Sequence, residues 1–294
     1  DARAAERDLD EGRASVFLDL PPDLESRSLA GKDPAVLLAV DGTDANTAGL
    51  TLGYAGQIAA EYAREQSAAE SARLGRPPGA PPLTLESRAW YNENLESRNF
   101  YMPSLLAQII TAVTLMLTAM AIVREREVGT LEQLLVTPIR PLELILGKTL
   151  PFATIGVVDA AISLLVVVGY FHVPLRGSLA LFFLAVMLYM VTTLSGGLLI
   201  STISRTQQQA MMGGFLFLFP AILLSGFMFP TDNMPWPVQW LSYLDPIRYM
   251  MDALRALFLK GAGLDLLWPD LAALTGLGVA ILAAAVWRFG ATLE

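Results

Sequence analysis

Apolar and polar positions follow two different patterns along the chain, and the change falls near residue 100. Before it, apolar residues alternate with polar ones or recur at helical spacing, as in a water-soluble domain. After it come apolar runs of about 20 residues, the length that crosses a hydrocarbon core of roughly 30 Å. The runs are 103–123, 147–170, 178–203, 210–229 and 268–287. We therefore predict an α-helical transmembrane bundle in residues 99–294, preceded by an α/β extracytoplasmic domain in residues 1–98.

The N-terminal domain has the short strands and helices of an α/β fold. The expected strands are 15–20, 35–40 and 83–91. The expected helices are 4–13, one opened by Pro21-Pro22, and 46–66. The last of these has small and apolar positions at helical spacing, so it should pack on the strands. Residues 66–83 contain a run of proline and glycine that holds neither helix nor central strand, and we interpret them as a linker or a loop.

Lys and Arg are concentrated in one set of loops between the apolar runs. They are Arg124, Arg126, Arg140 and Lys148 around the first loop, Arg205 in the third, and Arg288 at the tail. Because cytoplasmic loops carry the excess of Lys and Arg, these loops are expected to face the cytoplasm, including a segment at 124–146. The opposite side then holds the N-terminal domain, a short loop at 171–177 and a long segment at 230–267.

Composition narrows the class of protein further. The chain is 54% hydrophobic with a mean hydropathy of +0.49, values typical of a membrane protein. It has no cysteine, which excludes disulfides and thiolate metal sites, and its lone His172 makes no metal site. Its formal net charge is -8, so it has no basic surface for phosphate groups, and nucleic acid is not an expected partner. Neither G-x-x-x-x-G-K-[ST] nor G-x-S-x-G occurs, so we expect no catalytic residue, no metal and no cofactor site in this chain.

The most informative segment follows the first apolar run, with the sequence REREVGTLEQLLVTP at 124–138. On a helix Leu131, Leu134 and Leu135 share one face, while glutamates stay exposed to water. Such a short amphipathic helix at the membrane surface could dock in a groove of a soluble partner and pass its motion to the bundle. By spacing alone, a solvated connector is equally compatible.

The long outer segment has its own amphipathic pattern. Its apolar stripe consists of Ile247, Met250, Met251, Leu254, Leu257 and Phe258. Arg248, Asp252 and Arg255 lie on another face, with Arg248 and Asp252 spaced as an i, i+4 pair, and Gly261 can end the helix. Together with Trp236, Trp240 and Tyr243, which suit the headgroup region, this predicts a re-entrant or surface-lying helix that caps the outer side. A plain interfacial anchor is the alternative to a contact with substrate.

Three kinds of residue stand out within the apolar runs. Asp159 lies in the middle of the second run, where a carboxylate costs about 2.5 to 3.5 kcal/mol. It could bind a cation or relay protons, or it could be a neutral acid that fixes helix contacts. Pro220 should kink or break the fourth helix. The glycines Gly156, Gly196, Gly197, Gly213, Gly214 and Gly276 offer small faces where helices can approach closely.

The segment at 124–138 resembles the ABC-2 type permeases. The resemblance is to the branch of that family with a large external domain between its first two membrane helices. The cytoplasmic signature of that branch is written R-E-x-E-x-G-T-x-E-x-L. Its positions are matched by Arg124, Glu125, Glu127, Gly129, Thr130, Glu132 and Leu135, and the segment closes with Thr137 and Pro138. The stretches WYN at 90–92, RNF at 98–100 and LSYLDP at 241–246 are similar to further marks of the branch. The family has six helices, so we expect one more before residue 1, removed by truncation or processing.

The resemblance implies a function and a set of partners. It implies a multi-pass permease of the bacterial inner membrane that exports a hydrophobic or amphipathic substrate. Residues 124–138 would contact a cytoplasmic ATPase subunit, which binds ATP and Mg²⁺ in place of this chain. A second permease subunit, identical or a sibling, would complete the pathway, and a periplasmic adaptor is a candidate partner of the outer domain. The alternatives are a proton-coupled carrier that uses Asp159, and a membrane-anchored sensory or assembly protein.

Overall fold

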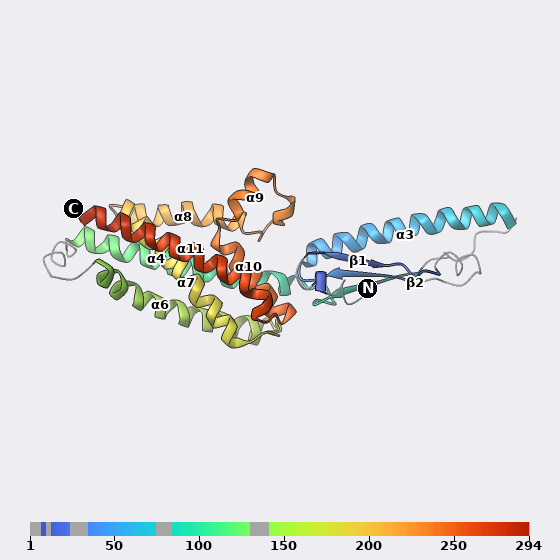
Figure 1. Cartoon of the computed structure of the whole chain (residues 1–294), viewed down its shortest axis with the longest axis horizontal. Helices are drawn as coiled ribbons and strands as arrows, with labels where there is room; N and C mark the ends of the chain where they lie inside the picture. Colours follow the sequence, from blue (N-terminus) through green and yellow to red (C-terminus); the bar gives the residue numbers. More distant parts are fainter. Residues whose placement is uncertain (1–6, 10–12, 24–34, 75–83, 130–140, 294) are drawn as a thin grey trace. The chain divides into compact units, whose positions relative to one another are not determined.

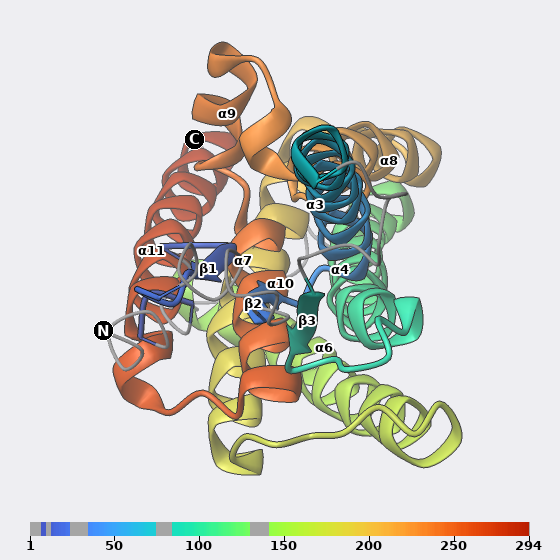
Figure 2. The same cartoon turned by 90° about the vertical axis from the view of Figure 1, so that its right-hand side faces the viewer.

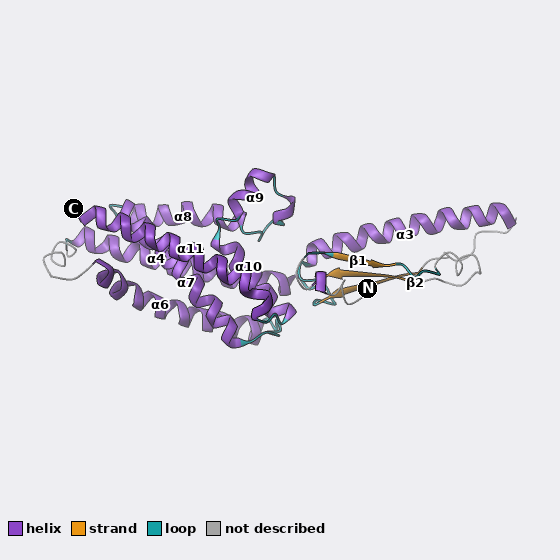
Figure 3. Cartoon of the chain, in the orientation of Figure 1, coloured by secondary structure: helices purple, strands orange, loops and turns teal. Residues whose placement is uncertain are grey.

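The computed structural model describes residues 7–9, 13–23, 35–74, 84–129 and 141–293 (Figure 1). They form two compact units, Asp1–Phe100 and Tyr101–Glu294, each described by itself below. All strands of the described residues belong to the first unit, and the second is helical (Figure 3).

The first unit is a small mixed sheet covered by one long helix. Strand β1 (Val16–Asp19) pairs antiparallel with β2 (Ala35–Asp41), which pairs parallel with β3 (Thr84–Trp90). Helix α3 (Ala45–Leu74) makes the crossover between the two parallel strands, as parallel pairing requires. Leu38 and Val40 of β2 form an apolar core with Ala48 of α3. The predicted α/β fold is thus confirmed.

The helix of this unit is longer than predicted. α3 continues to Leu74 instead of ending near Gln66, because the intervening sequence is rich in alanine, the best helix former. The first part of the expected linker at 66–83 is therefore helical, and its remainder lies outside the described residues. Most of the helix expected after Pro21-Pro22 also lies outside them, and of the helix expected at 4–13 only residues 7–9 are described as helical.

Five helices among the described residues are long and apolar enough to cross a membrane, and each contains one of the predicted runs or most of it. They are α4 (Ser97–Val128), α6 (Pro141–Leu165, extended by a π-helical turn at Val166–Tyr170), α7 (Leu179–Ile203), α8 (Gln207–Leu224) and α11 (Leu264–Leu293). In the most apolar stretch of 18 residues, 56% of α4 and 50% of α7 is buried inside the protein, against 22% for each of the other three helices. α4 and α7 are therefore the inner helices of the bundle.

Gly197 explains how closely these two inner helices approach. A Cβ atom at Gly197 of α7 would lie 2.7 Å from the backbone oxygen of Leu115 on α4. Only glycine leaves room for such an approach between helix backbones. The predicted role of small residues is confirmed at this position.

Pro220 does not break its helix. α8 runs continuously through Pro220 and ends at Leu224, so the predicted fourth run at 210–229 extends past the helix end. The chain turns at Gly226, which has a φ of 81° that residues with a Cβ rarely adopt. The end of α8 is thus set by this turn, and the single amide lost at the proline is tolerated within the helix, as in other membrane helices.

The segment at 230–267 is buried more deeply than a surface-lying helix would be. It contains α9 (Trp236–Ser242), α10 (Pro246–Arg255) and a π-helical turn (Ala256–Lys260) that ends at Gly261 with a φ of 67°. α10 packs against α7, α8 and α11, and Figure 2 shows it inside the helical unit. Every residue of the predicted apolar stripe is fully buried, and Trp236 and Trp240 of α9 are exposed. The stripe is confirmed, and among the two predicted placements a re-entrant one fits it.

Candidate functional site at the end of α4

The last three charged residues of α4 each contact a different helix. The carboxylate of Glu125 forms an ion pair with Lys148 of α6. Nη1 of Arg126 donates to the backbone oxygen of Ser204, the residue that ends α7, at 3.1 Å. We call this set, together with Glu127 and its partner Gln207, the α4 end cluster.

Glu127 contacts the first residue of α8 through both of its oxygens. Oε1 accepts a hydrogen bond from the backbone N–H of Gln207 at 2.8 Å, and Oε2 accepts one from Nε2 of the same residue at 2.6 Å. Helical geometry accounts for the three directions, since consecutive residues point about 100° apart around the axis. Three neighbouring side chains therefore reach three different helices.

An apolar layer lies directly beneath the cluster. Ile122 of α4 packs with Leu198 of α7 and Ala285 of α11. On another face of α4, Ala119 and Val123 pack with Ala210 of α8. The polar contacts of the cluster thus close an end of the bundle that is already packed.

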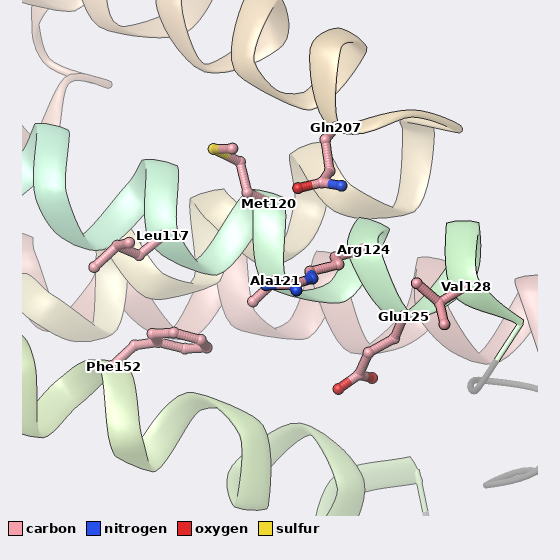
Figure 4. Close-up of a pocket in the computed structure, with 8 residues that line it drawn as sticks. All are labelled: Leu117, Met120, Ala121, Arg124, Glu125, Val128, Phe152 and Gln207. Carbon is pink, nitrogen blue, oxygen red and sulfur yellow. The ribbon is translucent and has the colours of Figure 1, made fainter.

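A cavity of about 620 Å³ opens beside the cluster between α4, α6 and α8 (Figure 4). Its lining residues are Leu117, Met120, Ala121, Arg124, Glu125, Val128, Phe152 and Gln207. Figure 4 shows Phe152 reaching from α6 toward α4, while Arg124 and Glu125 lie nearer the end of α4. The cavity is apolar on one side and charged at its end, a lining that suits an amphipathic molecule.

The predicted coupling residues fall into two groups. Arg124, Glu125 and Glu127 lie in the last turns of α4, and Gly129 ends that helix with a φ of 80°. The others, Thr130, Glu132, Leu135, Thr137 and Pro138, lie outside the described residues.

The sequence alone assigns a coupling role to only two of the six residues of the α4 end cluster, Glu125 and Glu127. In the sequence pattern Lys148 and Arg126 are only loop charges, and no local pattern points to Ser204 or Gln207. The available signal was that residues 124–146 and the loop after α7 are expected on the same side of the membrane. That fact alone does not say which side chains meet.

The polar residues of α10 lie near the opposite end of α4. Arg255 donates from Nε to Oγ of Ser104 at 3.1 Å, in the second turn of α4. Glu125 follows Ser104 by 21 positions, which at 1.5 Å per residue places it roughly 30 Å away along the helix. The two groups are therefore about a membrane thickness apart.

The predicted pair of Arg248 and Asp252 is replaced by other contacts. The guanidinium of Arg248 lies over the ring of Tyr243, 4.4 Å from its centre, and donates to Oγ of Ser242. Asp252 instead lies 3.7 Å from Arg255, one helical turn further on. The guanidinium of Arg248 therefore contacts an aromatic ring and a hydroxyl, and not the carboxylate of Asp252 that the i, i+4 spacing predicted.

Asp159 stands apart from both groups. It lies on α6, and its Oδ2 is buried with no hydrogen-bond partner among the described residues. The described part of the chain contains no group of three or more His, Cys, Asp or Glu side chains that could hold a metal ion.

Asp245 provides a test of the packing of α10. It begins this helix, with Oδ1 accepting a hydrogen bond from the N–H of Ile247 at 3.0 Å, and its side chain is buried. Burial raises the pKa of Asp245 to about 7, although the Ile247 hydrogen bond and the charge of Arg248 act in the opposite direction. A pKa that rises on folding stabilises the native state fully below about pH 4, and this contribution is lost as the pH rises toward the folded value.

We expect Asp245→Asn to remove this pH dependence, because asparagine still caps a helix but does not ionise. The melting temperature of the variant in detergent should match wild type near pH 4 and exceed it by roughly 10 °C at pH 8. The gap should widen up to pH 7 and then stay constant. A gap that is the same at every pH would contradict the burial of a raised-pKa carboxyl group at this position.

Comparison with known proteins gives a consistent set of similarities. The family model described as ABC-2 family transporter protein matches residues 1–287. The probable multidrug ABC transporter permease YbhR of Escherichia coli K12 is 36% identical over 263 residues, covering 90% of this chain and 70% of the relative. The inner membrane transport permease YhhJ of the same strain is 32% identical over 291 residues, covering 97% and 75%. The probable multidrug permease YbhS is 34% identical over 255 residues, covering 85% and 66%.

Proposed function

The chain belongs to the ABC-2 transporter family, as a multi-pass permease subunit of an ABC transporter, and from this premise we propose that it exports a hydrophobic or amphipathic substrate across the bacterial inner membrane. Permeases of this family carry no ATPase domain. A separate cytoplasmic ATPase subunit binds ATP and Mg²⁺, and it binds this chain at residues 124–138. The resemblance of this segment to the family's cytoplasmic signature supports this assignment.

The α4 end cluster is the observation that supports the proposal most. The signature begins in the last turns of α4, and side chains in those turns contact α6, α7 and α8. A partner that displaces the segment after Val128 therefore acts on a helix joined to three others. The adjoining cavity, with apolar walls and a charged end, supports an amphipathic substrate. The names of YbhR and YbhS support the class of drug-like substrates.

Two further partners belong to the proposal. A second permease subunit completes the pathway, an arrangement supported by the existence of two similar relatives, YbhR and YbhS. A periplasmic adaptor binds the first unit, and here the support is an exposed apolar stripe on α3. The stripe consists of Leu50, Tyr54, Ile58 and Tyr62, spaced four residues apart.

The direct test is purification of the tagged chain in detergent after co-expression with a candidate ABC ATPase subunit from the same genome. The proposal expects the ATPase to copurify in a stable ratio, and a variant lacking residues 129–138 to lose it. Copurification that does not depend on this segment would contradict the proposed docking.

A proton-coupled carrier remains the second candidate because of the unpartnered buried oxygen of Asp159. Under that function Asp159→Asn would abolish uptake driven by a pH gradient in vesicles. We expect instead that Asp159→Asn retains at least about half of the ATP-driven transport, because a neutral amide of the same shape keeps the packing of α6. Ethidium accumulation in inverted membrane vesicles, with ATP or with a pH gradient alone, separates the two functions.

A further inference from the structure

The two signature carboxylates of α4 are already used inside the chain. Both oxygens of Glu127 accept hydrogen bonds from Gln207, and Glu125 is paired with Lys148. Arg124, by contrast, has no ion-pair or hydrogen-bond partner among the described residues and is exposed. The signature residues of α4 thus differ in whether they are available to another protein.

The contacts of Arg126 and Glu127 match the electrostatics of the helix ends they reach. The last carbonyls of a helix carry partial negative charge and its first N–H groups carry partial positive charge. Arg126 binds the carbonyl of Ser204 at the end of α7, and Glu127 binds the N–H of Gln207 at the start of α8. A cation and an anion adjacent on α4 therefore cap two successive helix ends, each with the favourable sign.

The order of these contacts follows from the short connection between α7 and α8. α7 ends at Ile203 and α8 begins at Gln207, so the two ends of opposite partial charge lie close together. An arginine followed directly by a glutamate can reach both of them at once. Lys148 near the start of α6 supplies the third contact through Glu125.

We propose that Glu125, Arg126 and Glu127 are positioning residues that make the cytoplasmic ends of α4, α6, α7 and α8 move as one body, and that Arg124 is the charged residue of this turn that faces the ATPase. The inference rests on the proposed function and reassigns Glu125 and Glu127, which the family resemblance places against the ATPase. A displacement of the segment after Val128 is then passed to four helices together. Lys148, Ser204 and Gln207 join the residues on which coupling depends.

Exchange of the charges of one pair distinguishes an internal role from an external one. Glu125→Lys and Lys148→Glu should each lower ethidium transport per ATP hydrolysed by about fivefold or more, with the ATPase still copurifying. The double variant should recover most of the loss, because the pair is restored in the opposite sense. No recovery in the double variant, with loss of the ATPase from Glu125→Lys alone, would overturn the proposal.

A distance measurement tests the cluster without any transport assay or ATPase. The chain has no cysteine, so spin labels can be attached at Val128→Cys and Gln208→Cys of the full chain without background. With Gln207 intact the distribution of distances between the labels should be narrow, and Gln207→Leu should broaden it by about twofold or more. Glu93→Gln, in the first unit, is the control that should leave it narrow. A distribution that Gln207→Leu does not change would overturn the proposal, whereas failure of the ATPase to copurify would overturn only the proposed function.

Discussion

Exchange of Glu132 for arginine is expected to lower ATP-driven transport by more than about tenfold while folded protein accumulates to the wild-type level. Glu132 lies outside the described residues, so this expectation rests on its place in the signature that also contains Arg124 and Gly129. A glutamate that faces a partner's cation becomes, on reversal, a repulsive contact. Such a change at an interface costs about 2 to 5 kcal/mol, and each 1.4 kcal/mol is about a tenfold change in affinity.

The measurement is ethidium accumulation in inverted vesicles, together with the amount of ATPase that copurifies. Glu143→Arg is the matched control, because Glu143 is exposed in the same segment at 124–146, which we expect in the cytoplasm, but lies outside the signature. It should transport at close to the wild-type rate. Wild-type transport by Glu132→Arg would show that this glutamate does not face the ATPase.

Replacement of Gly197 by alanine is expected to destabilise the bundle strongly, although it adds only one methyl group. The new Cβ would lie 2.7 Å from the backbone oxygen of Leu115, 2.9 Å from Cβ of Thr118 and 3.2 Å from the backbone nitrogen of Ala119. Backbone atoms of a packed helix cannot swing aside, so α4 and α7 must separate. Overpacking of this kind costs about 1 to 3 kcal/mol, which corresponds to a fall in melting temperature of roughly 2 to 10 °C.

Gly276→Ala is the control for this prediction. Gly276 also lies within a membrane helix, α11, but a Cβ there would meet no atom within 4 Å. Alanine favours a helix over glycine by about 1 kcal/mol, so the melting temperature should stay the same or rise slightly. Equal losses for the two variants would contradict the close approach of α4 and α7 at Gly197.

The elements of the fold that depend on local pattern could be predicted from the sequence. Each predicted apolar run falls largely within a helix, because the hydrophobic length needed for a membrane is visible in one stretch of sequence. The stripe from Ile247 to Phe258 was also correct, since helical spacing fixes which residues share a face. Gly197 was rightly identified as a site of close approach. At Gly276 no atom of the described residues lies within 4 Å of the place of a Cβ, so no close approach occurs there within this chain.

The candidate site depends on contacts between residues far apart in the sequence, and these could not be predicted. Arg126 and Ser204 are 78 positions apart, and Glu127 and Gln207 are 80 apart. Sequence spacing suggested that Arg248 pairs with Asp252, but the ring of Tyr243 and the hydroxyl of Ser242 compete for the guanidinium. Spacing in the sequence therefore indicates which side chains could form a pair, but the packing of the helices determines which pairs form.

The central claim is that this chain crosses the membrane repeatedly and is driven by a separate ATPase. The most direct measurement is ethidium transport in liposomes reconstituted with the purified chain, with and without its ATPase, after a protonophore has collapsed any pH gradient. We expect transport only when ATP, the ATPase and this chain are all present. Transport by the chain alone, or its loss on addition of the protonophore to the complete system, would contradict it.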